Sequence, residues 1–348
     1  MIIKHEQTEE SSKTETEPPG RLRVGITFNL KKNISLGPVD AEAEFDDIET
    51  IREIKKSLEA AGFRVGLYEA TRDLPLRLSR KRPDIVLNIA EGMKGRGREA
   101  HVPAILNFMG IPFTGSDETT MCIAMDKALT KSFVSCHGIR TPGYMLVENG
   151  APLPEIDLPF PVIVKPNTEG SSKGISGLSV VHDRTALYSL LPEKLKAYKQ
   201  DMLIEEYIYG REFTVGLLGN AGNLRVFPPM EIIFDKESGG IYSYEVKRNF
   251  RHHVSYKCPP DLEDSLQKEL ENTAEVIFRL LGCKDMARID FRLSSDGRIY
   301  FIEINPLPGL APGYSDFPMI AAFNGMDHRA LISRIMASAL ERYRMPCL

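Results

Sequence analysis

The sequence predicts an α/β protein, α+β in its later part, that begins with a doubly wound domain on a parallel sheet. Three apolar runs, at 22–29, 63–68 and 84–90, alternate with segments of helical periodicity. This order requires parallel strands with helices on both faces. A later pair of apolar runs surrounds an Asp-Gly turn at 296–297, which indicates an antiparallel hairpin. The chain therefore passes into a mixed domain, and its 348 residues suffice for two or three domains.

The N-terminal domain follows a tail, residues 1–20, that is rich in Glu, Thr, Ser and Pro and is predicted to be disordered. A helix is expected over 46–61, because Ile51, Ile54 and Leu58 repeat at helical spacing. The other expected elements of this domain are a short helix at 74–82, a Gly-rich loop at 91–97, a helix at 101–109 and a closing segment at 111–115.

The mixed domain opens with a predicted helix over 119–137 that carries Lys127 and Lys131. An apolar strand at 160–166 then ends in Lys165. The elements expected after it are a small-residue loop at 169–174, strands at 202–208 and 211–218, a long amphipathic helix at 262–281 and a terminal helix at 331–343.

The predicted hairpin carries the strongest functional pattern. Arg288 and Asp290 share one face of its first strand, and Glu303 and Asn305 share one face of its second. Asp, Glu and Asn supply the hard oxygen ligands that suit Mg²⁺ better than Zn²⁺. A single such residue would be read as solvated surface. The whole set, followed at once by Pro-Leu-Pro-Gly309, predicts a site for Mg²⁺-bridged phosphates.

Two lysines and one loop are candidates for binding a nucleotide. Burying an unpaired ammonium is costly, so Lys165 at a strand end is predicted to contact a phosphate. Lys127 would reach the same phosphates, although alone it reads as an exposed helix charge. The loop 169–174 offers backbone N–H groups and two hydroxyls to a triphosphate, with a flexible turn as an equal alternative. It is not a Walker loop.

Two acidic residues, Glu205 and Glu212, lie around the apolar hinge Tyr207-Ile208. An apolar slot with backbone donors and acceptors suits adenine, and a Glu accepts from a ribose hydroxyl. Two exposed strand carboxylates are the simpler local interpretation.

Composition excludes several classes. The net charge of −4 gives no reason to expect a nucleic-acid or anionic membrane partner. The sequence contains no apolar run near 18 residues, and its polar, acidic start does not predict a signal peptide. Five scattered cysteines without a C-x-x-C pair indicate a reducing, cytoplasmic compartment and argue against a zinc site.

Taken together, these segments resemble the ATP-grasp superfamily and, within it, the D-alanine–D-alanine ligase family. The matching segments are 110–116 with 125–131, 161–166 with 169–174, 204–215, 242–247, 287–290 and 303–309, with Ser315 beyond them. The resemblance implies an ATP-grasp fold of two α+β subdomains, over 118–210 and 211–348, after a substrate-side domain at 21–117. It also implies ATP and two Mg²⁺ ions (or Mn²⁺) as cofactors. The substrates implied are amino acids, and the implied oligomer is a homodimer.

The same resemblance implies a role for each matching residue. The residues assigned to ATP are Lys127, Lys165, Glu169, Ser171, Ser172, Glu205, Tyr207, Ile208, Glu212 and Lys247. Those assigned to Mg²⁺ are Asp290, Glu303 and Asn305. Catalysis is assigned to Arg288, the Gly309 backbone N–H, Lys247 and Ser172, with Arg288 and Gly309 at the oxyanion. The substrate-side residues are Glu91, Arg98, Glu99, Tyr244, Gly309 and Ser315, the last at the acceptor's carboxylate.

The sequence departs from the family pattern at the first amino-acid pocket. The segments 40–47 and 91–100 replace a Glu-Arg-Glu-Val-Ser-Leu segment and a His-Gly…Gly-Glu-Asp-Gly loop. The expected activity is therefore an ATP-dependent carboxylate–amine ligase that works through an acylphosphate. The resemblance implies D-alanine–D-alanine ligation, a step in making the cell wall, as the first expectation, with a different amino-acid donor or acceptor as the alternative. A non-catalytic nucleotide-binding regulator is the remaining alternative.

Overall fold

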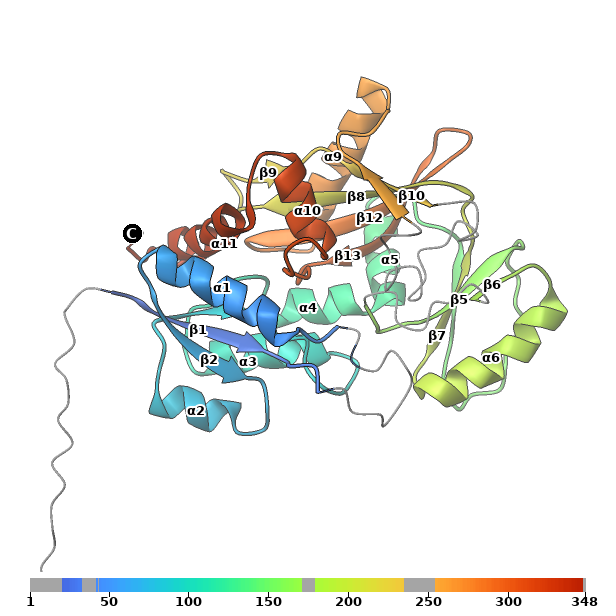
Figure 1. Ribbon diagram of the computed structural model, residues 1–348. Coiled ribbons are helices and arrows are strands. Elements are labelled where there is room, and N and C mark those ends of the chain that lie inside the picture. Colours follow the sequence, from blue (N-terminus) through green and yellow to red (C-terminus); the bar gives the residue numbers. More distant parts are fainter. Residues whose placement is uncertain (1–20, 33–41, 43, 171–178, 235–253, 347–348) are drawn as a thin grey trace, which may run out of the picture.

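The structure, a computed structural model, describes residues 21–32, 42, 44–170, 179–234 and 254–346. Within these residues the strands form three sheets, each covered by helices (Figure 1). The predicted tail, residues 1–20, lies outside the described residues.

The first sheet is parallel, with strand order β2-β1-β3. Its elements are β1 (Arg23–Phe28), α1 (Ile48–Ala60), β2 (Arg64–Glu69), α2 (Leu74–Arg80), β3 (Ile85–Asn88) and α3 (His101–Phe108). Successive residues of β3 face opposite sides: Leu87 packs with α1, whereas Val86 packs with α2 and α3. The predicted parallel sheet with helices on both faces is confirmed.

The predicted helix over 119–137 is wrong as a single element, because the chain forms two helices there. α4 (Glu118–Met125) ends before Asp126, and α5 (Lys127–Ser135) begins after it. Asp126 has an extended backbone, with φ −88° and ψ 101°, and its carboxylate accepts a hydrogen bond from the Leu129 N–H at 2.9 Å. Asp126 thus caps the N-terminus of α5, although the apolar periodicity of the sequence continues from α4 into α5.

The second sheet is antiparallel, with order β4-β7-β5-β6. Its strands are β4 (Tyr144–Val147), β5 (Val162–Pro166), β6 (Val180–Val181) and β7 (Met202–Glu206), and α6 (Arg184–Tyr198) packs on it. Strand β5 carries Lys165 near its end, within the predicted strand at 160–166.

The third sheet has six strands, with order β11-β10-β8-β12-β13 and β9 paired to β8. They are β8 (Gly210–Leu218), β9 (Arg225–Val226), β10 (Met230–Phe234), β11 (Val254–Lys257), β12 (Met286–Ser294) and β13 (Ile299–Asn305). Helix α9 (Asp264–Leu280) packs on one face, and α10 (Asp316–Phe323) and α11 (His328–Arg342) lie toward the first sheet (Figure 1). The predicted β12–β13 hairpin is confirmed.

One apolar cluster joins the start and the end of the chain. Ile51 and Ile54 of α1 and Ile335 and Met336 of α11 belong to the same buried cluster. The hairpin β12–β13 is thereby held opposite the ends of the parallel strands (Figure 1). Among the described helices, none combines the length and apolar character that crossing a membrane requires.

Candidate active site

A cleft of about 550 Å³ lies between the first domain and the β12–β13 hairpin. Helix α1 and the segment before it form one wall, and the hairpin with its Pro-Leu-Pro-Gly turn forms the other. Of the residues predicted for the site, those lining it are Glu91, Glu99, Lys127, Glu169, Arg288, Glu303, Asn305, Gly309 and Ser315. The cleft therefore brings together residues separated by more than 200 positions in the sequence.

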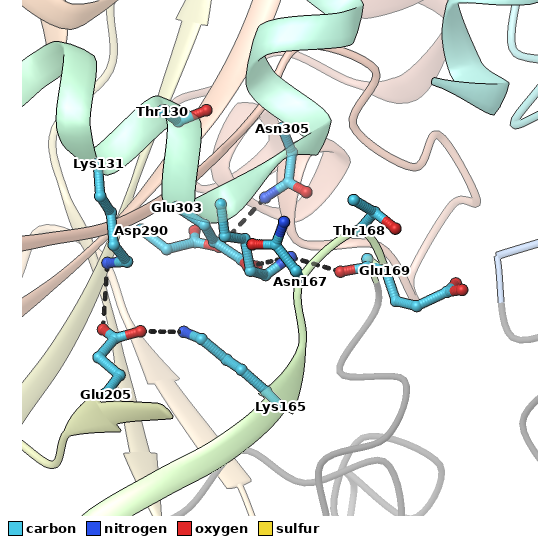
Figure 2. Close-up of polar contacts among 12 residues, drawn as sticks. Thr130, Lys131, Lys165, Asn167, Thr168, Glu169, Glu205, Asp290, Glu303 and Asn305 are labelled. Atoms are coloured by element: carbon cyan, nitrogen blue, oxygen red, sulfur yellow. Dashed lines mark hydrogen bonds and ion pairs between the residues drawn. The ribbon is translucent and has the colours of Figure 1, made fainter. Parts of the chain in front are cut away.

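The hairpin places its polar residues in register. Asp290 pairs with Glu303 and Arg288 with Asn305 across the two strands. The Arg288 guanidinium donates to both oxygens of Asp290, at 3.0 and 2.9 Å, and the Asn305 amide lies 3.3 Å from Asp290 Oδ2. Thr214 on β8 donates to Asp290 at 2.7 Å. The predicted metal-site residues thus form one cluster, which Figure 2 shows.

The chemistry of this cluster fits a hard cation. It offers two carboxylates and one amide oxygen, the donor types that Mg²⁺ prefers. Burial raises the pKa of Glu303, but Lys127, Lys165 and Arg288 outweigh it and bring the value to about 2, so this carboxylate is ionised. In the described part of the chain, no three His, Cys, Asp or Glu side chains form a metal cluster. Asn305 and the phosphates of ATP would have to complete the coordination.

The two predicted phosphate-binding lysines are both buried and point toward carboxylates. Lys127 Nζ lies 3.2 Å from Glu303 and also donates to the Glu169 carbonyl oxygen. Lys165 Nζ lies 2.7 Å from Glu205 (Figure 2). The exposed interpretation of Lys127 is therefore wrong, since its side chain is 8% exposed.

Sequence reasoning gave no role to Lys131, which the structure places at the centre of this network. Lys131 is fully buried, and its Nζ lies 3.1 Å from Glu205 (Figure 2). Burial lowers its pKa to about 8 against the opposing effect of Glu205. Its spacing of four residues from Lys127 on one helix was the available signal, because residues at i and i+4 share a face.

Of the acidic residues around the hinge, Glu205 is buried and Glu212 is 15% exposed. Burial would raise the pKa of Glu205, but Lys131 and Lys165 together lower it. Glu212 lies 2.7 Å from Arg292, whose guanidinium also lies 5.2 Å from the Tyr207 ring centre. Ile208 is buried beside them, and its carbonyl accepts from Arg292 at 3.4 Å. The simpler interpretation of two exposed carboxylates does not hold.

The Gly-rich loop and the loop after β5 meet through Arg98. Its guanidinium lies 2.6 Å from both Glu44 oxygens and 3.2 Å from Glu169, and it donates to the Thr168 carbonyl at 2.5 Å. The Gly170 N–H also donates to Glu44, at 2.6 Å. Arg98 therefore neutralises Glu44 and ties the first domain to the second sheet. Sequence reasoning had not singled out Glu44.

Two other carboxylates that border the cleft have raised pKa values. Burial, together with the charge of Glu99, raises the pKa of Glu91 well above its usual value. Burial raises the pKa of Glu99 to about 7, although Arg98 opposes it. Both side chains border the cleft, so the charge that Glu99 contributes there changes near neutral pH.

The turn after β13 brings Gly309 against Ser315. A Cβ on Gly309 would lie 2.7 Å from Ser315 Oγ, so no larger residue fits without a shift. Ser315 Oγ accepts from the Ala311 N–H at 3.2 Å. Ser171, Ser172, Tyr244 and Lys247 lie outside the described residues, so their predicted roles stay predictions.

Known proteins resemble this chain in sequence. The family model described as "D-ala D-ala ligase C-terminus" matches residues 148–337. An uncharacterized protein, y4sG of Sinorhizobium fredii, is 33% identical over 82% of this chain and 86% of its own length. A D-alanine–D-alanine ligase of Aquifex aeolicus is 33% identical over 87% of this chain and 98% of its own length.

Solved structures resemble it in fold. A D-alanine–D-alanine ligase from Bacillus anthracis complexed with ATP superposes with a TM-score of 0.73 at 23% identity, over 93% of this chain and 99% of that chain. The VanG D-Ala:D-Ser ligase from Enterococcus faecalis gives a TM-score of 0.70 at 19% identity, over 92% of this chain and all of that chain. At these identities the structural match concerns the fold alone.

Proposed function

The chain belongs to the D-alanine–D-alanine ligase family of ATP-grasp enzymes, which form C–N bonds, and on this premise we propose that it joins a carboxylate to an amine through an acylphosphate. The observation that carries the proposal is the cluster of Asp290, Glu303 and Asn305, of which Glu303 and Asn305 line the cleft together with Lys127 and Arg288. Carboxylates with flanking cations are what phosphoryl transfer requires.

Binding of ATP is assigned to the cationic side of the cluster. Lys127 and Lys165 neutralise phosphate oxygens, and Glu205 with Lys131 holds Lys165 in place. Asp290, Glu303 and Asn305 would hold Mg²⁺, which supplies charge neutralisation to the phosphates. The hinge of Tyr207 and Ile208 is assigned to adenine, and Glu212 to the ribose.

Formation of the amide follows in two steps. The carboxylate of the first substrate attacks the γ-phosphate, and ADP leaves. The amine of the second substrate then attacks the acyl carbon, the Arg288 guanidinium and the Gly309 N–H stabilise the oxyanion, and phosphate leaves. The nucleophiles belong to the substrates, so no nucleophilic Ser or Cys of the protein is required. A closed cleft keeps water from hydrolysing the acylphosphate.

The proposal is tested by phosphate release from ATP and Mg²⁺ across D- and L-amino acids, alone and in pairs. Release with D-alanine alone would identify the family's usual reaction. Release only with another amino acid, or with an unlike pair, would identify a different donor. If no amino acid elicits release, the carboxylate substrate is larger than an amino acid or the regulatory alternative gains support.

A matched pair of variants assigns the activity to the cluster. Glu303→Gln removes one carboxylate from the cluster, whereas Glu275→Gln removes an exposed one from α9 that pairs only with Arg279 among the described residues. We expect phosphate release to be lost in the first variant and kept in the second. Equal activity in both would contradict the assigned role of the cluster.

A further inference from the structure

Arg98 belongs to the loop in which the sequence departs from the family pattern, yet it lies behind the wall of the cleft. It begins the short 3₁₀ helix Arg98–Ala100 and is 5% exposed. Glu91 and Glu99 of the same loop line the cleft, whereas Arg98 is not one of the described residues that line it. Burying a guanidinium is costly unless it finds partners, so the contacts of Arg98 indicate its role.

The Arg98 guanidinium joins the first domain to the segment that follows β5. One terminal nitrogen lies 2.6 Å from both oxygens of Glu44 and 3.2 Å from Glu169 Oε2. The other terminal nitrogen donates to the Thr168 carbonyl at 2.5 Å, and the Gly170 N–H donates to Glu44 at 2.6 Å. The side chains of Glu44 and Glu169 are 5% and 11% exposed. Arg98 therefore lies between two nearly buried carboxylates that repel each other.

The segment that Arg98 holds is also in contact with the proposed phosphate-binding side. The Glu169 carbonyl oxygen accepts a hydrogen bond from the Lys127 ammonium, which lies 3.2 Å from Glu303. Figure 2 shows Thr168 and Glu169 at the edge of this polar cluster. A continuous set of contacts thus runs from the first domain through Arg98 and Glu169 to Lys127.

The same segment has separate contacts with its own domain. The Gln200 side chain accepts from the Thr168 N–H at 3.1 Å and from the Thr168 hydroxyl at 2.7 Å, and it donates to Glu169 at 2.7 Å. Loss of Arg98 would therefore leave the segment attached to the second sheet. It would also leave Glu44 and Glu169 to repel each other, and movement of Glu169 would draw its carbonyl away from Lys127.

We infer that Arg98 is a positioning residue for the phosphate site, which acts through Glu169 on Lys127 and contacts neither ATP nor an amino acid. This inference rests on the proposed function, in which Lys127 binds phosphate, and it adds a residue to that function. It replaces the expectation that Arg98 contacts a substrate. The first domain then contributes to the binding of ATP through a loop that departs from the family pattern.

The test compares a nucleotide that carries three phosphates with adenosine, which carries none. Binding of the non-hydrolysable analogue β,γ-imido-ATP with Mg²⁺ to the full chain is measured by calorimetry, and binding of adenosine by displacement of the analogue. We expect Arg98→Met to weaken the analogue about tenfold, as loss of an orienting partner does at a metal site, and adenosine by less than about twofold. A general structural defect would weaken both ligands alike. Equal weakening, or an unchanged affinity for the analogue, would overturn the inference.

Two further variants localise the effect. Lys94→Met removes an exposed cation from the same loop and should leave both affinities unchanged. An equal loss in Lys94→Met would attribute the effect to the charge of the loop and overturn the inference. Glu44→Gln combined with Arg98→Met removes the repulsion between Glu44 and Glu169, and should bind the analogue at least about threefold more tightly than Arg98→Met alone. Absence of this recovery would also overturn the inference.

A separate assay keeps the proposed function apart from this inference, because the calorimetry requires no turnover. Hydroxylamine traps an acylphosphate as a hydroxamate and releases phosphate. Hydroxamate formed from ATP and a carboxylic acid would support the ligase reaction, whatever the calorimetry shows. If no hydroxamate forms while the affinity for the analogue depends on Arg98 as expected, the result counts against the ligase reaction and upholds the role of Arg98.

Discussion

Arg288 connects the carboxylates of Asp290 and Asp316 and lines the cleft, so its loss should affect chemistry more than nucleotide binding. We predict that Arg288→Ala lowers turnover by roughly 10²–10³-fold, the usual effect of removing an oxyanion donor, and leaves ATP affinity within a few-fold. Steady-state turnover and ATP titration measure the two effects. Arg298→Ala removes an exposed arginine that pairs with Asp296 in the hairpin turn, and should leave both unchanged. Unaltered turnover in Arg288→Ala would refute its role.

Asp46, in the cleft wall before α1, should make stability depend on pH. Burial raises its pKa to about 7, although Lys31 opposes the effect. Because an unfolded Asp ionises near 3.8, the folded protein binds the extra proton between these values. The contribution of Asp46 to stability is therefore present below about pH 4 and is lost as the pH rises toward 7.

The neutral variant Asp46→Asn isolates this effect. We expect the free energy of unfolding to fall less steeply in the variant than in the wild type as the pH rises from about 4 to about 7. Denaturant unfolding at intervals of half a pH unit measures the two slopes. Parallel curves would show that Asp46 ionises in the folded protein as it does in the unfolded chain.

At the scale of elements, the break between α4 and α5 depends on Asp126. Its carboxylate caps α5 and also accepts from the buried Asn167 amide at 2.9 Å, and it pairs with Arg96. Asp126→Ala removes the cap and leaves Asn167 without this partner. We therefore predict a loss of about 2–4 kcal/mol in the free energy of unfolding, measured with urea.

A simpler cap provides the control for Asp126. Asp183 caps α6 at the exposed end of that helix, where it accepts from the Ala186 N–H at 2.8 Å. Asp183→Ala should cost about 1 kcal/mol, the usual value for a cap alone. Equal losses in the two variants would mean that the bond to Asn167 contributes nothing.

The β12–β13 hairpin and the helix break show what the sequence could and could not predict. Two alternating runs and an Asp-Gly turn fix both the pairing and the side-chain faces, so the cluster of Asp290, Glu303 and Asn305 was predictable. The break between α4 and α5 was not predictable, because the apolar period of the segment 119–137 continues across Asp126. Asp126 caps α5 and also binds Asn167, which is distant in sequence, so local sequence patterns do not show the break.

The pairing of buried charges could not be predicted from the sequence either. Lys131 and Glu205 come from different elements, α5 and β7, and each would be an unfavourable buried ion without the other. Propensity and periodicity describe one segment at a time, so neither indicates that two such residues meet.

At the scale of the whole molecule, the apolar clusters divide the chain differently from its sequence order. The sequence predicted domains at 21–117, 118–210 and 211–348, and these bounds stay a prediction. One cluster joins β1 and α1 with α11, whereas the second sheet and α6 have a cluster of their own. We therefore expect the first domain and the terminal helix to open together, and the second sheet to open separately.

Two core substitutions measured by hydrogen exchange test this coupling. Ile335 of α11 and Leu191 of α6 are both fully buried, one in each cluster. Ile335→Ala should cost about 2–5 kcal/mol and speed exchange in α1 and α11 alike, with little change in β5. Leu191→Ala should do the reverse, which makes each variant the control of the other. If Ile335→Ala speeds exchange in α11 while α1 stays protected, the two ends are separate units, and the cleft wall before α1 moves independently of the hairpin it faces.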